Sequence, residues 1–204
     1  MLDSLADRVM KKMSQAGSQY YRLVILAAPA GTGKTAVLQH VHHRTGVPLI
    51  NVNLELCRRM LDFTSRKRVL RLTPLLEEIL GAFTTASPAM QGASVADRPP
   101  QSEAVRQAGV VLLDNIEVLF DVSLKQDPLR LLQGLSRNKT IVASWSSEIM
   151  NEQQISRTEL YAHGDSDLST QSPAQFLVYA TPDHPEYRRY PIRDFLVVNP
   201  IDGA

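Results

Sequence analysis

The feature that most constrains the fold of this chain is the segment 28–35, which reads Ala-Pro-Ala-Gly-Thr-Gly-Lys-Thr. An uninterrupted apolar run, 23–27, precedes it, and the mixed apolar and polar residues 36–41 follow it. A strand, a glycine-containing turn and a helix in this order are the context in which a phosphate-binding loop occurs. The segment therefore predicts a nucleotide-binding site. A chance turn of Gly, Thr and Lys is the alternative interpretation.

The residue types of this segment suit a triphosphate with a magnesium ion. Backbone N–H groups of residues 30–35 can surround an anion, and the positive end of the following helix adds to the attraction. Gly31 and Gly33 allow conformations or a close approach that a Cβ would obstruct. We expect Lys34 to reach the outer phosphates and the Thr35 hydroxyl to bind Mg²⁺. The residues expected to hold ATP are Pro29, Ala30, Gly31, Thr32, Gly33, Lys34, Thr35 and Ala36.

One position departs from the usual form of this motif, because Ala28 stands where a first glycine normally occurs. Alanine is compatible with the turn if its φ is negative, since only a positive φ brings its Cβ into conflict with the backbone. The prediction of a phosphate-binding loop therefore requires a negative φ at Ala28.

Composition excludes several other kinds of protein. The chain has 204 residues, which is enough for one α/β domain, and its net charge of +1 gives no argument for nucleic-acid binding from bulk charge. Cys57 is the only cysteine, so an internal disulfide and a multi-cysteine zinc site are excluded and a reducing, cytoplasmic location is expected. No apolar run reaches the ~18 residues that span a bilayer, and the N-terminus lacks the pattern of a signal peptide. We expect no association with membranes.

The hydrophobic pattern predicts an open parallel sheet of about five strands flanked by helices. Strands are expected at 23–27, 49–53, 110–113, 138–145 and 176–180, with a further edge strand at 195–198. Helices are expected at 2–13, 36–43, 54–61, 74–80 and 129–135, and residues 147–160 are polar and helical in pattern. Thr73 is expected to cap the helix that begins with Pro74.

We expect a single domain over residues 1–204. An amphipathic helix occupies its first segment, 1–20, because apolar residues recur there at helical spacing. Residues 84–104 are rich in Ala, Ser, Pro, Gly and Gln, which predicts a flexible surface loop. Residues 182–204 are expected to form a C-terminal extension.

Asp114 is the expected second half of the site, because it ends a continuous apolar run. In nucleotide hydrolases a carboxylate in this position holds Mg²⁺, whereas a helix-capping role is the alternative. The group that activates water is left open. Asn115 occupies the position where many such enzymes have Glu, and it can orient water but cannot accept its proton. Glu117, one helical turn away, and Glu55, after the second strand, are the candidate carboxylates, and we favour Glu117.

Three further residues are candidates for catalysis. Ser144 ends the fourth strand, which in the usual order lies between the loop strand and the Asp114 strand, so its hydroxyl could contact the outermost phosphate or the water. Arg130 and Arg137 flank that strand and could act on a neighbouring subunit's site; solvated helix-end residues are the alternative. Assembly of the chain with itself, as a homo-oligomer, is therefore one expectation, and a partner protein that supplies what the site lacks is the alternative.

A basic segment follows the second strand. It could bind DNA phosphates, or it could be a solvated face or a docking surface for a protein partner. Its positively charged residues are Arg58, Arg59, Arg66, Lys67, Arg68 and Arg71.

The chain resembles the small P-loop ATPases of BREX phage-exclusion systems (the BrxF family). The residues that carry the resemblance read AAPAGTGKTAVL, NVNLELCRRML, LTPLLEEIL, VLLDNIEVLFDVSLKQDPLRLLQGLSRNKTIVASW and VYATPDHPEYRRYP, and they span most of residues 23–191. The run from Asp114 to Glu117 is also similar to the metal motif of STAND-type regulatory ATPases. The resemblance implies a bacterial cytoplasmic ATPase that serves defence against phage beside other BREX components, among them a methyltransferase and larger ATPases.

The predicted core is that of an ASCE or AAA+-like P-loop NTPase without a lid domain, because only about two dozen residues follow the fifth expected strand. We expect an ATPase with slow turnover. A nucleotide-dependent assembly module that binds ATP with little hydrolysis is the second hypothesis, which Asn115 and the missing lid favour. A small-molecule kinase is the third hypothesis. It is the weakest, because the sequence shows no arginine-bearing lid over an acceptor site.

Overall fold

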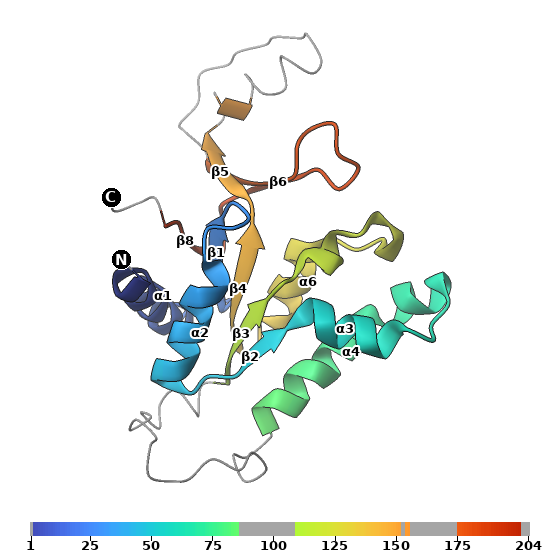
Figure 1. Cartoon of the computed structure of the whole chain (residues 1–204), viewed down its shortest axis with the longest axis horizontal. Coiled ribbons are helices and arrows are strands. Elements are labelled where there is room, and N and C mark those ends of the chain that lie inside the picture. The colour runs from blue at the N-terminus through green and yellow to red at the C-terminus, as the bar shows by residue number, and fades with distance from the viewer. Residues whose placement is uncertain (1, 86–108, 152–153, 156–174, 201–204) are drawn as a thin grey trace.

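The structure, a computed structural model, describes residues 2–85, 109–151, 154–155 and 175–200. Within these residues, five strands form a parallel sheet in the order β2-β3-β4-β1-β8 (Figure 1). These strands are β1 (Leu23–Ala28), β2 (Leu49–Asn51), β3 (Val110–Asp114), β4 (Thr140–Ser146) and β8 (Leu196–Val198). The expected parallel sheet of about five strands is confirmed, and β4 lies between the strand that precedes the loop 28–35 and the strand that ends in Asp114.

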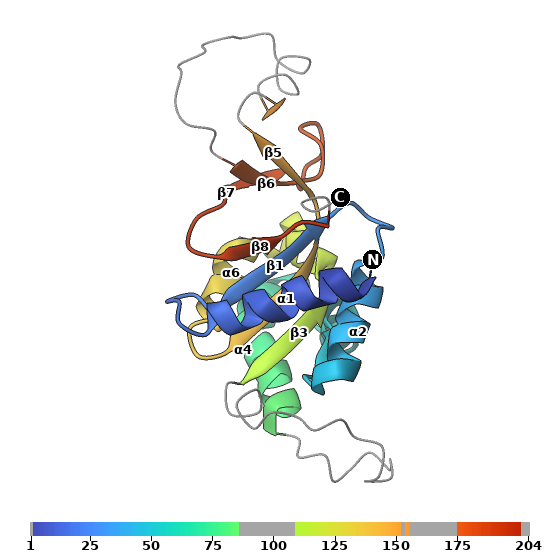
Figure 2. The same ribbon diagram turned by 90° about the vertical axis from the view of Figure 1, so that its left-hand side faces the viewer.

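Helices cover both faces of this sheet. The α-helices are α1 (Leu2–Ala16), α2 (Lys34–Thr45), α3 (Val52–Met60), α4 (Ser65–Thr85) and α6 (Pro128–Leu135). Two short 3₁₀ helices, η3 (Glu117–Phe120) and η4 (Val122–Leu124), follow β3. Figures 1 and 2 show α1 and α2 on one face and α3, α4 and α6 on the other.

Alternation along the strands explains this arrangement, because successive side chains of a strand point to opposite faces. In β1, Val24 and Leu26 pack with the buried residues of α1 and α2, whereas Leu23 and Ile25 pack with those of α3, α4 and α6. All six residues of β1 are buried, which is why its sequence is continuously apolar.

The N-terminal amphipathic helix is confirmed as α1. Its buried apolar residues are Ala6, Val9, Met13 and Ala16. An ion pair between Asp7 and Arg44 at 2.7 Å joins it to α2, and the Nε2 of His40 lies 2.9 Å from the Oδ1 of Asp3. The helix therefore packs on the sheet beside α2.

The expected start of the helix at Thr73 is wrong. A single helix, α4, begins at Ser65 and contains Pro74 in its interior. Proline removes one backbone donor and disfavours a helix interior, but the buried Leu72, Leu76 and Ile79 hold this helix against the sheet. Burial therefore overrides the local signal, and the helix also takes in four residues of the basic segment, Arg66, Lys67, Arg68 and Arg71.

The expected fifth parallel strand at 176–180 is also wrong. This run is β6 (Gln175–Tyr179), the middle strand of a separate antiparallel sheet with β5 (Glu148–Asn151) and β7 (Arg188–Pro191). The fifth parallel strand is instead β8, which pairs with β1. The helical pattern expected from residue 147 onward is replaced by β5 over 148–151.

Aromatic contacts fix the small sheet above the carboxyl ends of β1 and β4 (Figure 2). Phe120 stacks on Tyr179 with ring centroids 3.6 Å apart, and its edge-to-face partner Trp145 lies at 4.9 Å. Trp145 in turn meets Tyr190 of β7 at 5.8 Å. Because Trp145 belongs to β4 and is fully buried, the two sheets share one core.

The structure describes most of the expected C-terminal extension but little of the expected flexible loop. Of residues 182–204, the described part supplies β7 and β8, so it completes both sheets rather than extending beyond the domain. The flexible loop expected over 84–104 lies outside the described residues except for the end of α4. Among the helices that the structure describes, none has the length and apolar character needed to cross a bilayer.

Candidate nucleotide-binding site

The loop 28–35 connects β1 to α2 at the carboxyl edge of the parallel sheet. Gly31 and Gly33 have φ values of 78° and 84°, in the left-handed region that glycine tolerates best. Ala28 is not among the residues with positive φ, so alanine fits at the position where glycine is usual.

The start of α2 leaves backbone donors available. Gly33 occupies the N-cap position and has no side chain that could accept from the first turn. The first intrahelical bond runs from the Val37 N–H to the Gly33 carbonyl at 3.1 Å. The N–H groups of Lys34, Thr35 and Ala36 precede it and have no acceptor within the helix, so the loop presents donors to an anion.

Lys34 is folded back into the loop and is 8% exposed. Its Nζ donates to the carbonyl of Ala28 at 2.9 Å and to that of Pro29 at 2.8 Å. Both carbonyls have a second donor, since Ala28 accepts from the N–H of Ser147 and Pro29 accepts from the hydroxyl of Thr32. The Lys34 ammonium can therefore move from these two carbonyls to a phosphate, and each carbonyl keeps one hydrogen-bond donor.

The electrostatic environment of Lys34 is mixed. Burial lowers the pKa of Lys34, and the negative charges of Glu117 and Asp114 oppose that shift. The two carboxylates on which the sequence prediction rests thus act on the same ammonium. The site combines one buried cation with two anions, which is a charge arrangement suited to a magnesium-bound polyphosphate.

Asp114 is buried at the end of β3, and its Oδ1 accepts a hydrogen bond of 2.6 Å from the hydroxyl of Ser144. Asp114 lies two positions after Leu112, and Ser144 two positions after Val142, so both point to the face of the sheet that α2 covers. The parallel pairing of β3 with β4 brings them to the same edge as the loop. Ser144 was expected to contact the phosphate or the water, but its single hydroxyl proton is already donated to Asp114.

Glu117 lies in η3 and accepts a 2.7 Å hydrogen bond at Oε1 from the hydroxyl of Ser146. Glu55, the other candidate base, pairs with Arg59 at 3.5 Å and Arg58 at 3.8 Å on its own helix. Of these two glutamates, Glu117 alone contributes to the pKa shift at Lys34. The structure therefore favours Glu117 over Glu55 as the carboxylate of the site.

Asn115 has a structural reason to be asparagine. Its φ is 53°, a left-handed conformation that asparagine adopts more readily than glutamate does. Its carbonyl accepts from the N–H of Asn53 at 3.0 Å, which fixes the turn after β3. A glutamate here would be strained, and the turn instead delivers Glu117 to the edge.

The metal-binding part of the prediction has suitable donors. Thr35 is exposed at the start of α2, and Asp114 supplies a buried carboxylate. Hydroxyl and carboxylate oxygens are the ligands that Mg²⁺ accepts beside phosphate oxygens and water, so the residues present fit this ion. In the described part of the chain, no group of three or more His, Cys, Asp or Glu side chains could hold a metal by itself.

The two candidate arginines have different surroundings. Arg130 is exposed in the first turn of α6, the helix that leads back to the start of β4. Arg137 lies at the opposite edge of the sheet from the loop, above the rings of Tyr20 and Tyr21 at 5.6 Å and 5.9 Å. A hydrogen bond with Tyr21 raises the pKa of Arg137. The chain's own site therefore does not include Arg137.

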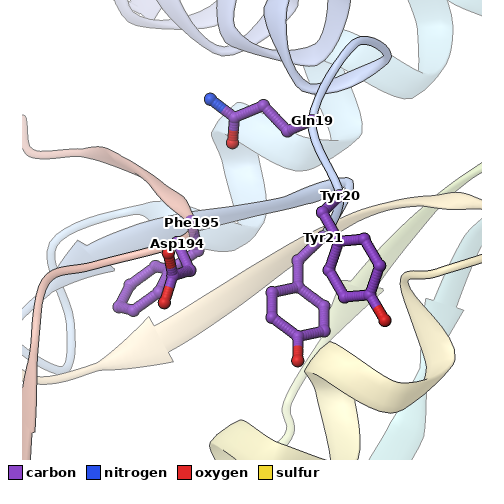
Figure 3. Close-up of a pocket in the computed structure, with 5 residues that line it drawn as sticks. All are labelled: Gln19, Tyr20, Tyr21, Asp194 and Phe195. Atoms are coloured by element: carbon purple, nitrogen blue, oxygen red, sulfur yellow. The ribbon is translucent and has the colours of Figure 1, made fainter.

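The same far edge carries a hollow of about 330 Å³. Figure 3 shows Tyr20 and Tyr21 on one side of it and Asp194 and Phe195 on the other, with Gln19 at its rim. It lies before the start of β1, whereas ligands of open parallel sheets bind beyond the carboxyl ends of the strands. This hollow is therefore separate from the candidate site.

The residues of the basic segment lie on α3 and α4. Arg68 donates to the carbonyl of Phe63 at 3.0 Å, and the Lys67 ammonium lies 4.1 Å from the centre of the Phe63 ring. Arg71 pairs with Glu78 at 3.6 Å. Arg58 and Arg59 share Glu55, as described above. These internal contacts hold the basic residues in place, and their charge is partly neutralised.

Sequence reasoning missed Ser146 and Ser147. The sequence does contain a signal for Ser146, because Ser144 and Ser146 are two positions apart in a strand and therefore point to the same face. Ser147 had no signal, because its position depends on where β4 ends and β5 begins. With Pro29 and Ala30 it lines a cavity of about 270 Å³, roofed by residues of the small sheet.

Because the pKa of Lys34 is lowered, the charged Lys34 ammonium destabilises the folded state, and the size of this effect depends on pH. Below that pKa the folded and unfolded states are both protonated, so the destabilisation is fully present. Between it and the ordinary value of 10.5, the unfolded state binds more protons and the stability of the wild type rises with pH. We expect Lys34→Met to be at least as stable as the wild type at pH 7, and the difference to narrow by pH 10. Urea unfolding of both proteins at the two pH values measures it, and an unchanged difference contradicts the assignment.

No family model matches the chain, and neither the curated proteins nor the solved structures contain a match to it. Function is therefore inferred from the geometry of the site and from the sequence resemblance.

Proposed function

We propose that this chain is a P-loop NTPase of the ASCE type that binds Mg·ATP and hydrolyses it slowly. The observation that carries the proposal is the meeting of three charged side chains at one edge. The Lys34 ammonium lies in the loop before α2, and its charge interacts with Asp114 and Glu117. The strand order, with β4 between β1 and β3, supports this class.

Binding is assigned to the loop and to Asp114. The N–H groups of 34–36 and the Lys34 ammonium neutralise phosphate charge, while Thr35 and Asp114 hold Mg²⁺. When bound, the magnesium ion neutralises charge on the outer phosphates. Ser144 fixes the Asp114 carboxylate in one orientation through its 2.6 Å hydrogen bond, so the carboxylate needs little rearrangement on binding.

Hydrolysis is assigned to Glu117. It orients a water molecule and accepts its proton as the water oxygen attacks the terminal phosphorus, and the bond to the leaving ADP breaks. In the structure its Oε1 is engaged with Ser146, so this contact must loosen or be shared when the base acts. That requirement agrees with slow turnover.

The second candidate function is a nucleotide-dependent assembly module. Two observations favour it: Asn115 follows the metal-binding Asp114 directly, and Glu117 is held by Ser146. In this case bound ATP would stabilise one conformation for partner proteins without being consumed.

The biological setting is proposed from the sequence resemblance. A bacterial cytoplasmic protein of a BREX defence system, acting beside other BREX components and assembling with itself, agrees with the candidate site. A neighbouring subunit's Arg130 is the arginine we assign to the completed site, since Arg137 is bound to Tyr20 and Tyr21.

We also propose DNA as a ligand of the basic residues of α3 and α4. These two helices carry six positive side chains, although several have internal partners. Leu61 and Leu70 are 73% and 70% exposed in the same region, which phosphate contacts do not require. A protein partner is therefore the alternative occupant.

The proposed activity predicts how turnover responds to substitution. In a phosphate-release assay with Mg·ATP, we expect Glu117→Gln to lower the rate by about 10²-fold or more, as loss of a general base does. Lys34→Met should abolish both turnover and ATP binding, because it removes the cation that contacts the outer phosphates.

Glu55→Gln is the matched control, because it removes the other candidate carboxylate and should leave turnover nearly unchanged. Loss of turnover in Glu55→Gln, with Glu117→Gln active, would reassign the base. Tight ATP binding without turnover in the wild type, with or without DNA, would establish the assembly module instead.

The proposed DNA ligand predicts a salt-dependent weakening of binding on substitution. Replacing Arg66, Lys67 and Arg68 together by Ala should weaken duplex binding and reduce the slope of log K against log salt by ~0.9 for each phosphate that is no longer neutralised. A filter-binding titration at two salt concentrations measures both. Lys11→Ala with Lys12→Ala on α1 is the control for general charge. Equal affinity in wild type and triple variant would remove DNA from this proposal.

A further inference from the structure

The cavity beside the loop 28–35 lies at the junction of the two sheets. Its volume is about 270 Å³. Pro29 and Ala30 form its floor, the end of β4 forms one wall, and the small antiparallel sheet supplies apolar residues such as Met150 and Val178. It is therefore a space shared by the phosphate-binding loop and the sheet above it.

Ser147 is held at this junction by both sheets. It is the single residue between β4 and β5, and its N–H donates to the carbonyl of Ala28 at 3.2 Å. The same carbonyl accepts from the Lys34 Nζ at 2.9 Å. Ser147 and the Lys34 ammonium are thus neighbours around one oxygen atom.

The side chain of Ser147 has an unused hydroxyl. The residue is 6% exposed, and its Oγ has no hydrogen-bond partner within the described residues. A buried hydroxyl without a partner disfavours folding, so its presence calls for an explanation. A ligand that accepts a hydrogen bond in the cavity would supply one.

The position of the cavity identifies which part of the ligand it meets. Ser146 lines the cavity and donates to Glu117, the proposed base, so the cavity adjoins the end of the site where the bond is cleaved. The Lys34 ammonium, which we assign to the outer phosphates, and the Ser147 N–H both donate to the carbonyl of Ala28. The outermost phosphate is therefore the part of the ligand that we assign to the cavity.

The serines at the end of β4 differ in what their hydroxyl protons do. Ser144 donates to Asp114 and Ser146 donates to Glu117, so neither has a proton left for a phosphate. Among the described residues at this junction, Ser147 is the serine with a free donor. A phosphate oxygen is an anionic acceptor, which forms a stronger hydrogen bond than a neutral acceptor does.

We infer that Ser147 donates a hydrogen bond to the terminal phosphate of the bound nucleotide, and that this contact makes the site prefer the triphosphate to the diphosphate. The inference rests on the proposed function. The rest of the cavity leaves room for an attacking water, which needs about 30 Å³. Ser147 is thus a specificity-determining residue supplied by the junction of the two sheets.

The test compares nucleotides that differ in the terminal phosphate. Calorimetry with Mg²⁺ gives Kd values for ADP and for the slowly hydrolysed analogue AMP-PNP in wild type and Ser147→Ala. We expect the ratio of the ADP Kd to the AMP-PNP Kd to fall about tenfold or more in the variant, as removal of a charged hydrogen bond does. The affinity for ADP should stay within about twofold, because the groups that bind the inner phosphates are unchanged.

Stability separates this role from a merely structural one. Removing an unpartnered hydroxyl should not lower the melting temperature of the nucleotide-free protein. Ser136→Ala is the matched control, since Ser136 is also buried, at the far edge of the sheet, and donates to the Gln133 carbonyl at 2.9 Å. This control should lower the melting temperature and leave the Kd ratio unchanged.

The possible outcomes separate the inference from the proposed function. An unchanged ratio in Ser147→Ala, or an equal weakening of affinity for both nucleotides, overturns the inference and leaves the proposed function intact. Binding of neither nucleotide by the wild type overturns both. If Ser147→Ala does not fold, Ser147→Cys replaces it, because a thiol of similar size is only a weak donor and the same fall in the ratio is expected.

Discussion

An ammonium group at the buried edge of a sheet must be compensated by carbonyl oxygens or by negative charge. In this chain the Lys34 ammonium is compensated by the carbonyls of Ala28 and Pro29 and by the charges of Asp114 and Glu117. All of these groups meet only because β1, β4 and β3 are parallel neighbours, so that the loop and both carboxylates reach the same edge. The rest of the candidate site depends on this arrangement.

The end of β4 organises the polar groups around that ammonium. Ser144 orients Asp114, Ser146 holds Glu117, and Ser147 keeps a free hydroxyl beside the loop. The small antiparallel sheet begins immediately afterwards and is fixed to the main core through Trp145. We propose that a sheet placed in this way contributes to the nucleotide site, since its residues enclose the cavity beside the loop. Buried, incompletely compensated polar groups of this kind lower the stability of the free protein and are typical of binding sites.

The loop and Asp114 could be predicted from sequence because each is a local signal: a glycine-containing turn between strand and helix, and a carboxylate after a buried run. The expected position of Ser144 followed from strand order. The contact between Ser146 and Glu117 could not be predicted, because it joins residues 29 positions apart through a turn that depends on the left-handed Asn115. The local pattern also could not predict which sheet a strand joins. The strands β6 and β8 are both short apolar runs, yet they belong to different sheets. The start of α4 was missed because tertiary burial overrides the effect of Pro74.

Isothermal titration of Mg·ATP into the wild type and into Lys34→Met, at pH 7 and millimolar magnesium, addresses the central claim directly. If the loop before α2 holds the triphosphate, the wild type will bind about one nucleotide per chain, and the variant, although folded, will release no binding heat. Absence of binding heat from the wild type at millimolar ATP, or equal binding by the variant, would contradict the assignment of this edge as a nucleotide site.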